Sequence, residues 1–469
     1  MESTKNAGTN WSLAYNLTIL KLDLTLRLKS LQFAMKHSKN PIPGFLENFE
    51  QHGETYRAYL GGIQPMMVTK DPDIIRHVLQ KNHRNYIKTP MIFDKLRRFL
   101  GNGLLTSEGP YWLQQRRLIQ PGFHKQRLQA LVEIINQVIV ETEPADLRQS
   151  EQQPAIDVYP MMMRLAFDIV TRSLFSTAVS AEKLDLLSNS LTTIQAFLVQ
   201  QIRQPYLNPW FQISGQLAKH IKLGKAADEV LLGMIRNRRN SGESREDLLQ
   251  MLLDARYEDT GESMTDQQLL EETNILITAG HETTANALSW IFYLLAKHPD
   301  KQELLREELQ KVLGNAAPTF MDLPKLSYTT QVIEESMRLY PPAWVTDRQS
   351  AIDDEVKGHQ IPKGTMVVLA IYALHHDAKF WDEPEVFEPE RFAPENRKQM
   401  SGNYSYLPFG GGPRLCIGNS FAMMEMQLVI AHYLRKYCVQ LVGNESPEML
   451  PLVTLRPKNG ISIIFEAMA

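Results

Sequence analysis

The chain has 469 residues, with 50 lysines and arginines against 53 aspartates and glutamates, a formal net charge of −3 and 43% hydrophobic residues. These values are typical of a globular protein with a large buried core, and the lack of a basic excess argues against nucleic acid as a partner. The two cysteines, Cys416 and Cys438, are too few for a disulfide framework or for a zinc site of three or four thiolates. They fit a reducing compartment, so we expect a cytoplasmic protein.

The N-terminal segment is predicted to lie outside the main domain. It contains no run of about 18 apolar residues, so we expect no transmembrane anchor. From Leu13 to Met35 the leucines fit both an alternating strand pattern and helical spacing, and we favour an amphipathic helix because leucine prefers helices. Two roles for this helix stay open: docking onto the body of the protein, or weak peripheral contact with a membrane surface through Lys21, Arg27 and Lys29.

The sequence predicts a segment of residues 1–40 followed by one domain over residues 41–469. Residues that favour strands surround Gly61-Gly62 and predict a hairpin, and Asp71-Pro72 predicts the start of a helix. The later elements are predicted in this order: mostly helix over 111–306 with polar breaks over 143–154 and 236–244, short strands after Pro341, a last helix over 418–438, and strands over 452–465. The fold class that follows is mainly α with small β-sheets, in a single large domain.

One predicted helix is unusually long, because Thr265-Asp-Gln-Gln268 forms a capping box and the apolar pattern continues to His298-Pro299. At about 1.5 Å per residue this helix spans roughly 50 Å, enough to cross the whole protein. Its middle, Ala279-Gly-His-Glu-Thr-Thr284, is a poor helix interior, because glycine and hydroxyl residues weaken backbone hydrogen bonding. The segment is either a tolerated local defect or a distortion that opens a groove for a small ligand.

The segment Phe409-Gly-Gly-Gly-Pro-Arg-Leu-Cys-Ile-Gly418 is the second unusual feature. Its glycines allow a tight loop and a close approach of the backbone to a flat group. Cys416 precedes the last helix, where backbone N–H groups and the helix dipole stabilise a thiolate, whereas a cysteine alone is more often a packing residue. Arg414 adds a fixed positive charge. A thiolate, a glycine platform and an arginine together fit haem, with sulfur bound to iron and the arginine to a propionate.

A third feature is the pair Glu335 and Arg338, which lie on one face of a predicted helix just before Tyr340-Pro-Pro342. By spacing alone they predict an ordinary helical ion pair. A further arginine, Arg391, lies in a proline-rich stretch shortly before the cysteine loop.

Together these motifs resemble those of the cytochrome P450 family. The family's cysteine loop is matched at Phe409, Gly410, Gly412, Arg414, Cys416 and Gly418. Its long-helix motif is matched at Ala279, Gly280, Glu282, Thr283 and Thr284. The remaining motif positions are Glu335, Arg338, Arg391, Trp112 and Arg116. The resemblance runs from about Pro41 to the C-terminus and is closer to the fatty-acid-hydroxylase and microsomal members, although the missing anchor resembles the soluble prokaryotic type.

The resemblance implies haem b (iron protoporphyrin IX) as the cofactor, crossed by the long helix. Cys416 would be the axial ligand of the iron. The other haem-contacting residues would be Trp112, Arg116, Ala279, Gly280, Arg348, Phe409, Arg414 and Gly418, with Trp112 and the three arginines at the propionates. Glu335, Arg338 and Arg391 would form a buried ionic network that fixes the cysteine loop. Glu282 and Thr283 would be the catalytic residues, which supply protons during oxygen activation.

The resemblance further implies a monooxygenase that inserts one oxygen atom from O2 into a lipophilic small molecule, such as a fatty acid or terpenoid. The sequence contains no flavin, nicotinamide or iron–sulfur motif, so electrons would come from a ferredoxin or flavodoxin with its NAD(P)H-dependent reductase. We expect this partner to dock at basic residues such as Arg117, Lys125 and Arg127. The alternatives are a haem-thiolate isomerase or peroxygenase, against which the Glu282–Thr283 pair argues, and a non-catalytic haem sensor.

By the same resemblance, the substrate pocket would include Phe93, Leu105, Phe197, Trp344 and Leu455. These side chains are apolar, which fits a lipophilic substrate, although each of them fits an ordinary core position equally well. The identity of the substrate and the position of its oxidation stay open. We expect a monomer.

Overall fold

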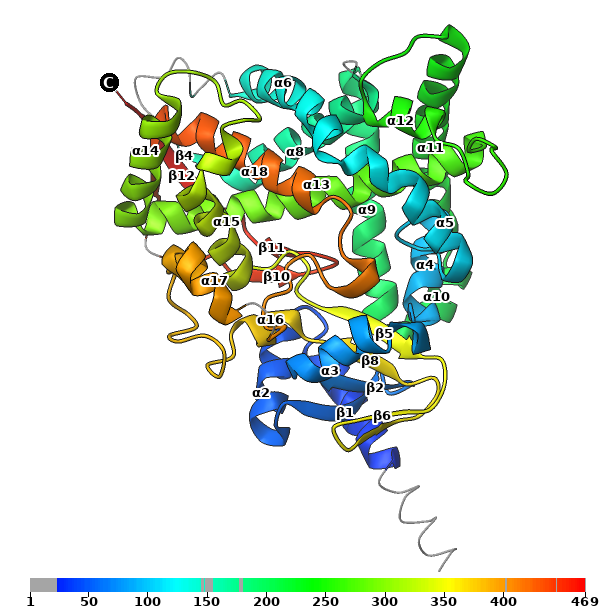
Figure 1. Cartoon of the computed structure of the whole chain (residues 1–469). Helices are drawn as coiled ribbons and strands as arrows, with labels where there is room; N and C mark the ends of the chain where they lie inside the picture. Colours follow the sequence, from blue (N-terminus) through cyan, green and yellow to red (C-terminus); the bar gives the residue numbers. More distant parts are fainter. Residues whose placement is uncertain are drawn as a thin grey trace, which may run out of the picture.

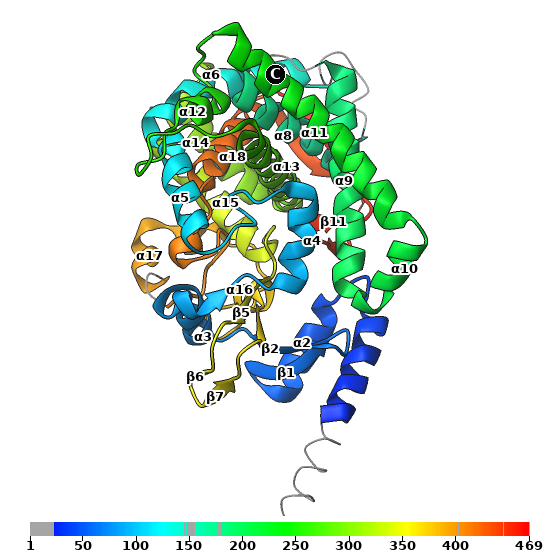
Figure 2. The same ribbon diagram turned by 90° about the vertical axis from the view of Figure 1, so that its right-hand side faces the viewer.

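Helix α13 (Asp266–Lys297) runs through the centre of the molecule, with other long helices around it (Figure 1). The computed structural model describes residues 23–144, 147, 155–176, 180–400, 403–443 and 445–468. Helix α13 packs against α8 (Val158–Phe175), α11 (Gln216–Ser241), α15 (Ser327–Leu339) and α18 (Asn419–Leu434). Figure 2 shows the same helices gathered around α13 after a turn of 90°.

The central helix is buried on all sides over its second half, where every residue from Thr284 to Ala296 is buried. A helix that is apolar all round belongs in the core of a large domain, which explains why α13 has no solvent-facing side there. Its start is the predicted capping box, in which Thr265 accepts from the Gln268 N–H and Gln268 reaches back to Thr265. The other helices are α2 (Ile42–His52), α3 (Pro72–Arg76), α4 (Pro90–Leu100), α5 (Gly109–Ile119), α6 (Lys125–Thr142), α9 (Ala181–Arg203), α10 (Asn208–Ile213), α12 (Leu248–Asp254), α14 (Pro299–Leu313), α16 (Ile371–His375) and α17 (Pro394–Met400).

A five-stranded sheet lies at the lower end of the helical body in Figure 1, with the strand order β1-β2-β8-β5-β3. Its first two strands form the predicted hairpin, in which Thr55 pairs with Thr69 and Gly61 and Gly62 turn with positive φ. The strands of this sheet are β1 (Thr55–Leu60), β2 (Gln64–Thr69), β3 (Tyr86–Ile87), β5 (Thr346–Ser350) and β8 (Met366–Leu369). The smaller sheets are built from β4 (Ala155–Asp157), β6 (Asp354–Val356), β7 (His359–Ile361), β9 (Tyr437–Leu441), β10 (Met449–Pro451), β11 (Leu455–Pro457) and β12 (Ser462–Ala467).

The N-terminal helix covers residues 23–36 in the described part of the chain, which confirms a helix rather than a strand there. One face docks onto the hairpin and α2: the buried Ser30 hydroxyl accepts the Tyr59 N–H at 3.0 Å, and the Phe33 ring stacks on Phe45. The opposite side leaves Leu24 and Leu28 more than half exposed, at 57% and 54%. The earlier leucines, and Lys21, lie outside the described residues.

The mainly α architecture with small β-sheets is confirmed. Two element ends differ from the predictions. The last helix ends at Leu434 rather than near 438, because the following residues pair as β9 with β12. Helix α11 continues to Ser241, past the polar break predicted from Arg236. Within the described residues, every helix is too short or too polar to cross a bilayer.

Candidate active site

The cysteine loop is a tight turn that joins the 3-10 segment η7 (Gly412–Arg414) to α18. Gly412 has a φ of +65°, and a Cβ there would lie 1.9 Å from the carbonyl oxygen of Leu79. Glycine is therefore needed at this position for the approach to the backbone of a neighbouring segment. The Cys416 N–H donates to the Phe409 carbonyl at 3.0 Å and closes the loop.

The thiol of Cys416 lies in an environment that disfavours its charged form unless a positive group is near. The side chain is exposed, yet the protein atoms around it reduce its solvation, and this burial raises the pKa of the thiol. The Gly418 N–H and the charge of Arg116 act in the opposite direction. Arg116 is held close by its hydrogen bond to the Leu415 carbonyl at 2.9 Å. A bound metal ion would remove the thiol proton outright, so these surroundings suit a metal thiolate.

A cluster of cations lies beside this loop. The Arg414 guanidinium is 3.7 Å from the centre of the Trp112 ring, and it donates to the Glu108 carboxylate at 2.7 Å. Burial lowers the pKa of Arg414 to about 10 and is also the main cause that lowers the pKa of Arg348. Arg414 therefore lies close to both Trp112 and Arg348, and the contact of these residues with propionates stays a prediction.

Lys88 is a member of this cluster that sequence reasoning missed. Its side chain is 7% exposed and donates to the Leu105 carbonyl. Burial, followed by the charges of Arg414 and Arg348, lowers the pKa of Lys88 to about 6. These cations destabilise one another, and Glu108 is the nearby carboxylate. An anionic group bound here, such as the two propionates of haem, would relieve this repulsion. A lysine before a Thr-Pro pair carries no sequence signal for this role.

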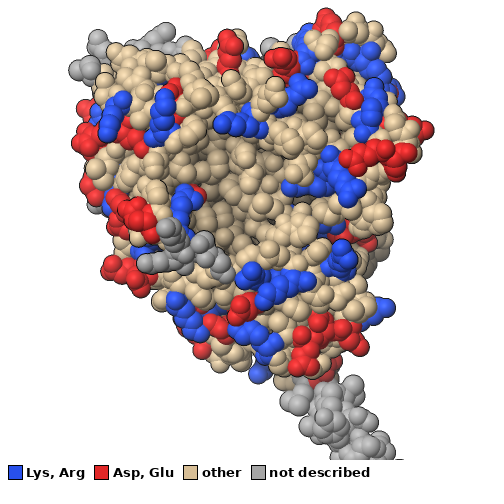
Figure 3. Space-filling model, in the orientation of Figure 1, with Lys and Arg blue, Asp and Glu red and all other residues tan. Residues whose placement is uncertain are grey.

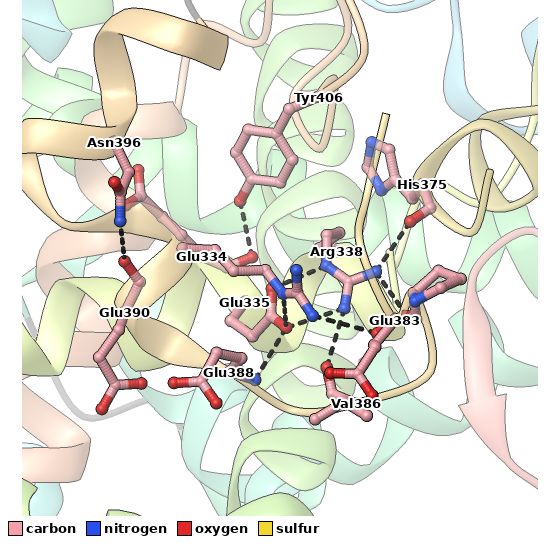
Figure 4. Close-up of polar contacts among 12 residues, drawn as sticks. Glu334, Glu335, Arg338, His375, Glu383, Val386, Glu388, Glu390, Asn396 and Tyr406 are labelled. Atoms are coloured by element: carbon pink, nitrogen blue, oxygen red, sulfur yellow. Dashed lines mark hydrogen bonds and ion pairs between the residues drawn. The ribbon is translucent and has the colours of Figure 1, made fainter. Parts of the chain in front are cut away.

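The Glu335–Arg338 pair is the centre of a buried network (Figure 4). Both side chains have 0% exposure, and the guanidinium forms a two-pronged contact with the carboxylate at 2.7 and 2.8 Å. The remaining Arg338 N–H groups donate to the carbonyls of His375 at 2.9 Å, Pro384 at 2.7 Å and Val386 at 3.2 Å. The pair is therefore satisfied on all sides, as a buried charge must be.

Arg391 and the chain before the cysteine loop attach to the same network. Arg391 lies 3.4 Å from the Glu335 carboxylate and donates to the Glu383 carbonyl at 3.0 Å. The His375 ring accepts the Leu407 N–H at 2.9 Å, and the Tyr406 hydroxyl donates to the carbonyl of Glu334 at 2.8 Å. The network thus holds residues 406–407 in place, directly ahead of Phe409.

Helix α13 has one accessible face in its middle. Ala279 is exposed and Gly280 and Thr283 are partly exposed, although most of the helix around them is buried. The Thr283 hydroxyl donates to the Ala279 carbonyl at 2.6 Å, and the helix continues through this point without interruption. Of the two alternatives for this segment, a distortion that interrupts the helix is not seen, and the accessible face is a strip of small side chains.

Glu282 points away from that strip into the protein. It is 3% exposed, its Oε1 accepts the Thr454 hydroxyl at 2.7 Å, and burial raises the pKa of its carboxyl. Asn286 donates to the same hydroxyl at 2.9 Å. Thr454 and Asn286 are further residues around the acid that sequence reasoning missed, because their contact with Glu282 joins distant segments.

Comparison with known proteins decides the family. The profile described as "Cytochrome P450" matches residues 23–465. The chain is 32% identical to cyclooctatin synthase of Streptomyces melanosporofaciens over 439 residues, which is 92% of this chain and 90% of that protein. It is 33% identical to cyclooctat-9-en-7-ol 5-monooxygenase of the same organism, over 82% of this chain and 83% of that protein. Mouse cytochrome P450 4A10 is 33% identical over 90% of this chain and 84% of its own length.

The chain belongs to the cytochrome P450 family. As a P450 it is a monooxygenase enzyme whose cofactor is haem b. P450 chemistry also implies O2, an electron-donating partner and a lipophilic substrate. Three features of the site fit this cofactor: the exposed thiol of Cys416, the cation cluster beside the cysteine loop, and the accessible strip of α13.

The predicted pocket residues of this P450 fall into separate groups. Leu105 is 37% exposed in the loop held by Lys88, whose ammonium lies 5.1 Å from the Phe93 ring centre. Trp344 and Leu455 are buried together in another cluster. Phe197 is buried with Phe99 and Phe211 and stacks on His220, so the structure does not bring it to the other four. Their role in binding substrate stays a prediction.

Proposed function

We propose that this P450 inserts one oxygen atom from O2 into a lipophilic small molecule of the fatty-acid or terpenoid class. The observation that carries the proposal is the pair on α13, in which Thr283 lies on the accessible strip and the buried acid Glu282 is next to it. One relative is named for the oxidation of cyclooctat-9-en-7-ol, which supports a lipophilic cyclic alcohol as one class to screen. The apolar side chains of Leu105 and Phe93 also favour a lipophilic ligand.

Several of the predicted haem-contacting residues have a defined role in this reaction. Cys416 ligates the iron, and Arg116, Arg348, Arg414, Trp112 and Lys88 hold the propionates. When bound, haem with a thiolate ligand supplies the electron-rich iron that favours O–O cleavage. The protein holds the loop through Gly412 and the Glu335–Arg338 pair, while Glu282 and Thr283 hold and move protons toward the accessible strip.

Replacing Thr283 by alanine tests the proton-supplying role. The haem is expected to stay bound, because the hydrogen bond of the Thr283 hydroxyl, to the Ala279 carbonyl, lies within α13. Without the hydroxyl, at least half of the reducing equivalents should leave as hydrogen peroxide instead of product. Product and peroxide formed per NADPH are the measurement, with Thr283→Ser as the matched control. Full product yield in Thr283→Ala would show that the hydroxyl has no part in proton supply.

Electrons reach the haem, in this proposal, from a ferredoxin or flavodoxin served by an NAD(P)H-dependent reductase. The face shown in Figure 3 is hollowed near its centre, with Lys and Arg side chains around the hollow. Lys125 lies near the cysteine loop, because Lys125 and Phe409 both line a cavity of about 590 Å³. Arg117 and Arg127 are exposed nearby along the chain, and an acidic partner would be steered to them.

Neutralising these charges should slow reduction by the partner. Arg117→Gln, Lys125→Gln and Arg127→Gln together are expected to lower the rate of reduction by a ferredoxin at least tenfold at low salt, and much less at high salt. Stopped-flow absorbance measures the rate, and reduction by dithionite should be unchanged. The matched control neutralises three exposed lysines of α11, Lys219, Lys222 and Lys225. Equal rates in the two triple variants would contradict docking at this face.

The reconstituted system also separates the alternatives. Product that requires NADPH, O2, ferredoxin and reductase together is expected of the monooxygenase. Product formed with peroxide alone, or by rearrangement without NADPH, would indicate the peroxygenase or isomerase. Haem binding without any product across the screened lipids and terpenoids would favour the sensor.

We also propose that the protein is a cytoplasmic monomer. Residues 1–40 form a segment distinct from the domain over 41–469, and this segment makes weak contact with membranes. Leu24, Leu28 and Met35 are exposed on the outer side of the N-terminal helix, which is a suitable apolar face. Arg27 pairs with Asp23 at 2.8 Å, so its charge is already engaged.

Vesicle sedimentation tests this contact. Leu24→Ser with Leu28→Ser should lower the fraction bound to vesicles of phosphatidylglycerol and phosphatidylcholine at least threefold. The control pair, Leu304→Ser with Met321→Ser, removes apolar surface that is exposed elsewhere, at 45% and 64%. Undiminished sedimentation of the first pair, or no sedimentation of the unaltered protein, would contradict membrane contact.

A further inference from the structure

Glu282 is enclosed on the side that faces away from the accessible strip. Its Oε1 accepts from Thr454, whereas its Oε2 is buried without a well-formed hydrogen bond among the described residues, although the nearby Gln195 amide lowers the pKa of the carboxyl. An acid that gives up protons in each catalytic cycle has to recover them from solvent. Because the carboxyl points away from the strip on α13, water on the opposite side of the helix would be a more direct source of these protons.

A cavity of about 300 Å³ lies on that side, between α8, α9 and β11. Arg456 and Tyr159 form part of its wall, together with polar side chains of α9 such as Ser188 and Asn189. A cavity of this size with polar side chains in part of its wall has room for several water molecules. Arg456 lies in β11, and Thr454 directly precedes this strand, two positions before Arg456. The residue that contacts Glu282 and the residue that borders the cavity are therefore neighbours.

The charge of Arg456 also acts on Glu282 and Tyr159. The charge of Arg456 lowers the pKa of Glu282 against the larger effect of burial. Burial raises the pKa of Tyr159, and both Arg456 and Glu282 act on its hydroxyl. The charged and titratable groups that face Glu282 are thus Arg456 from β11 and Tyr159 from α8, while α9 contributes the amide of Gln195.

We propose that the cavity bordered by Arg456 and Tyr159 is the solvent entry through which Glu282 is reprotonated. A proton passes from bulk water through cavity water to the Glu282 carboxylate, which becomes the acid, and the acid later returns to carboxylate when it releases a proton toward Thr283. No electron moves in this relay. Arg456 is a positioning residue that stabilises the carboxylate and orients the water. The inference rests on the proposed role of Glu282 in proton supply.

Infrared spectroscopy of the ferric, haem-loaded protein tests the coupling between Arg456 and Glu282 without turnover. The carboxyl band of Glu282 is assigned by its loss in Glu282→Gln and followed against pH. Arg456→Met should lower the acid dissociation constant of Glu282 at least threefold, and Arg456→Lys should restore it. Arg164→Met is the matched control, because Arg164 borders the same cavity but pairs with Asp168 at 2.9 Å. An unchanged constant in Arg456→Met, or an equal change in Arg164→Met, would overturn the coupling.

Hydrogen–deuterium exchange of the same carboxyl tests the route itself. After dilution into D2O at a pH where Glu282 is protonated, Ser188→Trp should slow the shift of its band at least fivefold by filling the cavity. Glu182→Trp places the same side chain on the same helix outside the cavity wall and should leave the rate unchanged. Equal exchange rates in Ser188→Trp and the unaltered protein would show that solvent enters elsewhere. Both readouts are independent of product formation, so their failure differs from failure of the monooxygenase assay.

Discussion

Arg338→Met is expected to unfold the haem-binding region. The substitution leaves the Glu335 carboxylate fully buried with Arg391 3.4 Å away as its remaining cation, and it removes donors from three backbone carbonyls. Breaking a buried pair in this way costs roughly 3–5 kcal/mol. This is a large part of the roughly 5–15 kcal/mol that stabilises a typical protein. Urea unfolding followed by circular dichroism, and the haem content of the purified protein, measure the loss.

A neighbouring ion pair provides the control for this variant. Arg397 pairs with Glu334, one residue before Glu335 on the same helix, but its side chain is 46% exposed. Exposed pairs contribute at most about 1 kcal/mol, so Arg397→Met should change the free energy of unfolding little. If the two variants unfold at the same urea concentration, the buried pair does not hold the region together.

The second large effect is expected at Cys416. Cys416→Ala should remove the thiolate ligand and abolish product formation, while the cation cluster around Arg414 still allows some haem to bind. Electron paramagnetic resonance of the ferric protein should then lose the signature of a thiolate ligand. Cys438→Ala is the control, because Cys438 lies in β9, in a part of the structure without a haem motif. A thiolate signature that survives in Cys416→Ala and disappears in Cys438→Ala would reverse the assignment.

The local parts of this structure were predictable from sequence because they depend on neighbouring residues. The capping box at Thr265 and the hairpin at Gly61-Gly62 follow from side-chain and backbone preferences within a few residues. The end of the last helix was not predictable, because residues after Leu434 form a strand only through pairing with β12. Tertiary pairing overrides local helix preference at such places.

The candidate site divides in the same way. The spacing of Glu335 and Arg338 predicted their contact, but the carbonyls of His375 and Val386 that complete it come from a distant segment. Lys88 carries no motif, and only the fold places it beside Arg414. Phe197 packs among aromatic side chains of α4 and α10, partners that its apolar character alone could not identify, and its role in the pocket stays a prediction.

The spectrum of the reduced protein with carbon monoxide tests the central claim most directly. The unaltered protein is expressed with adequate haem supply, reduced with dithionite, and measured with and without the gas. We expect a strongly red-shifted Soret band, because the Cys416 thiolate would donate electron density to the iron. A band at the position of a histidine-ligated haem, or no haem band, would contradict thiolate ligation and the site built on it.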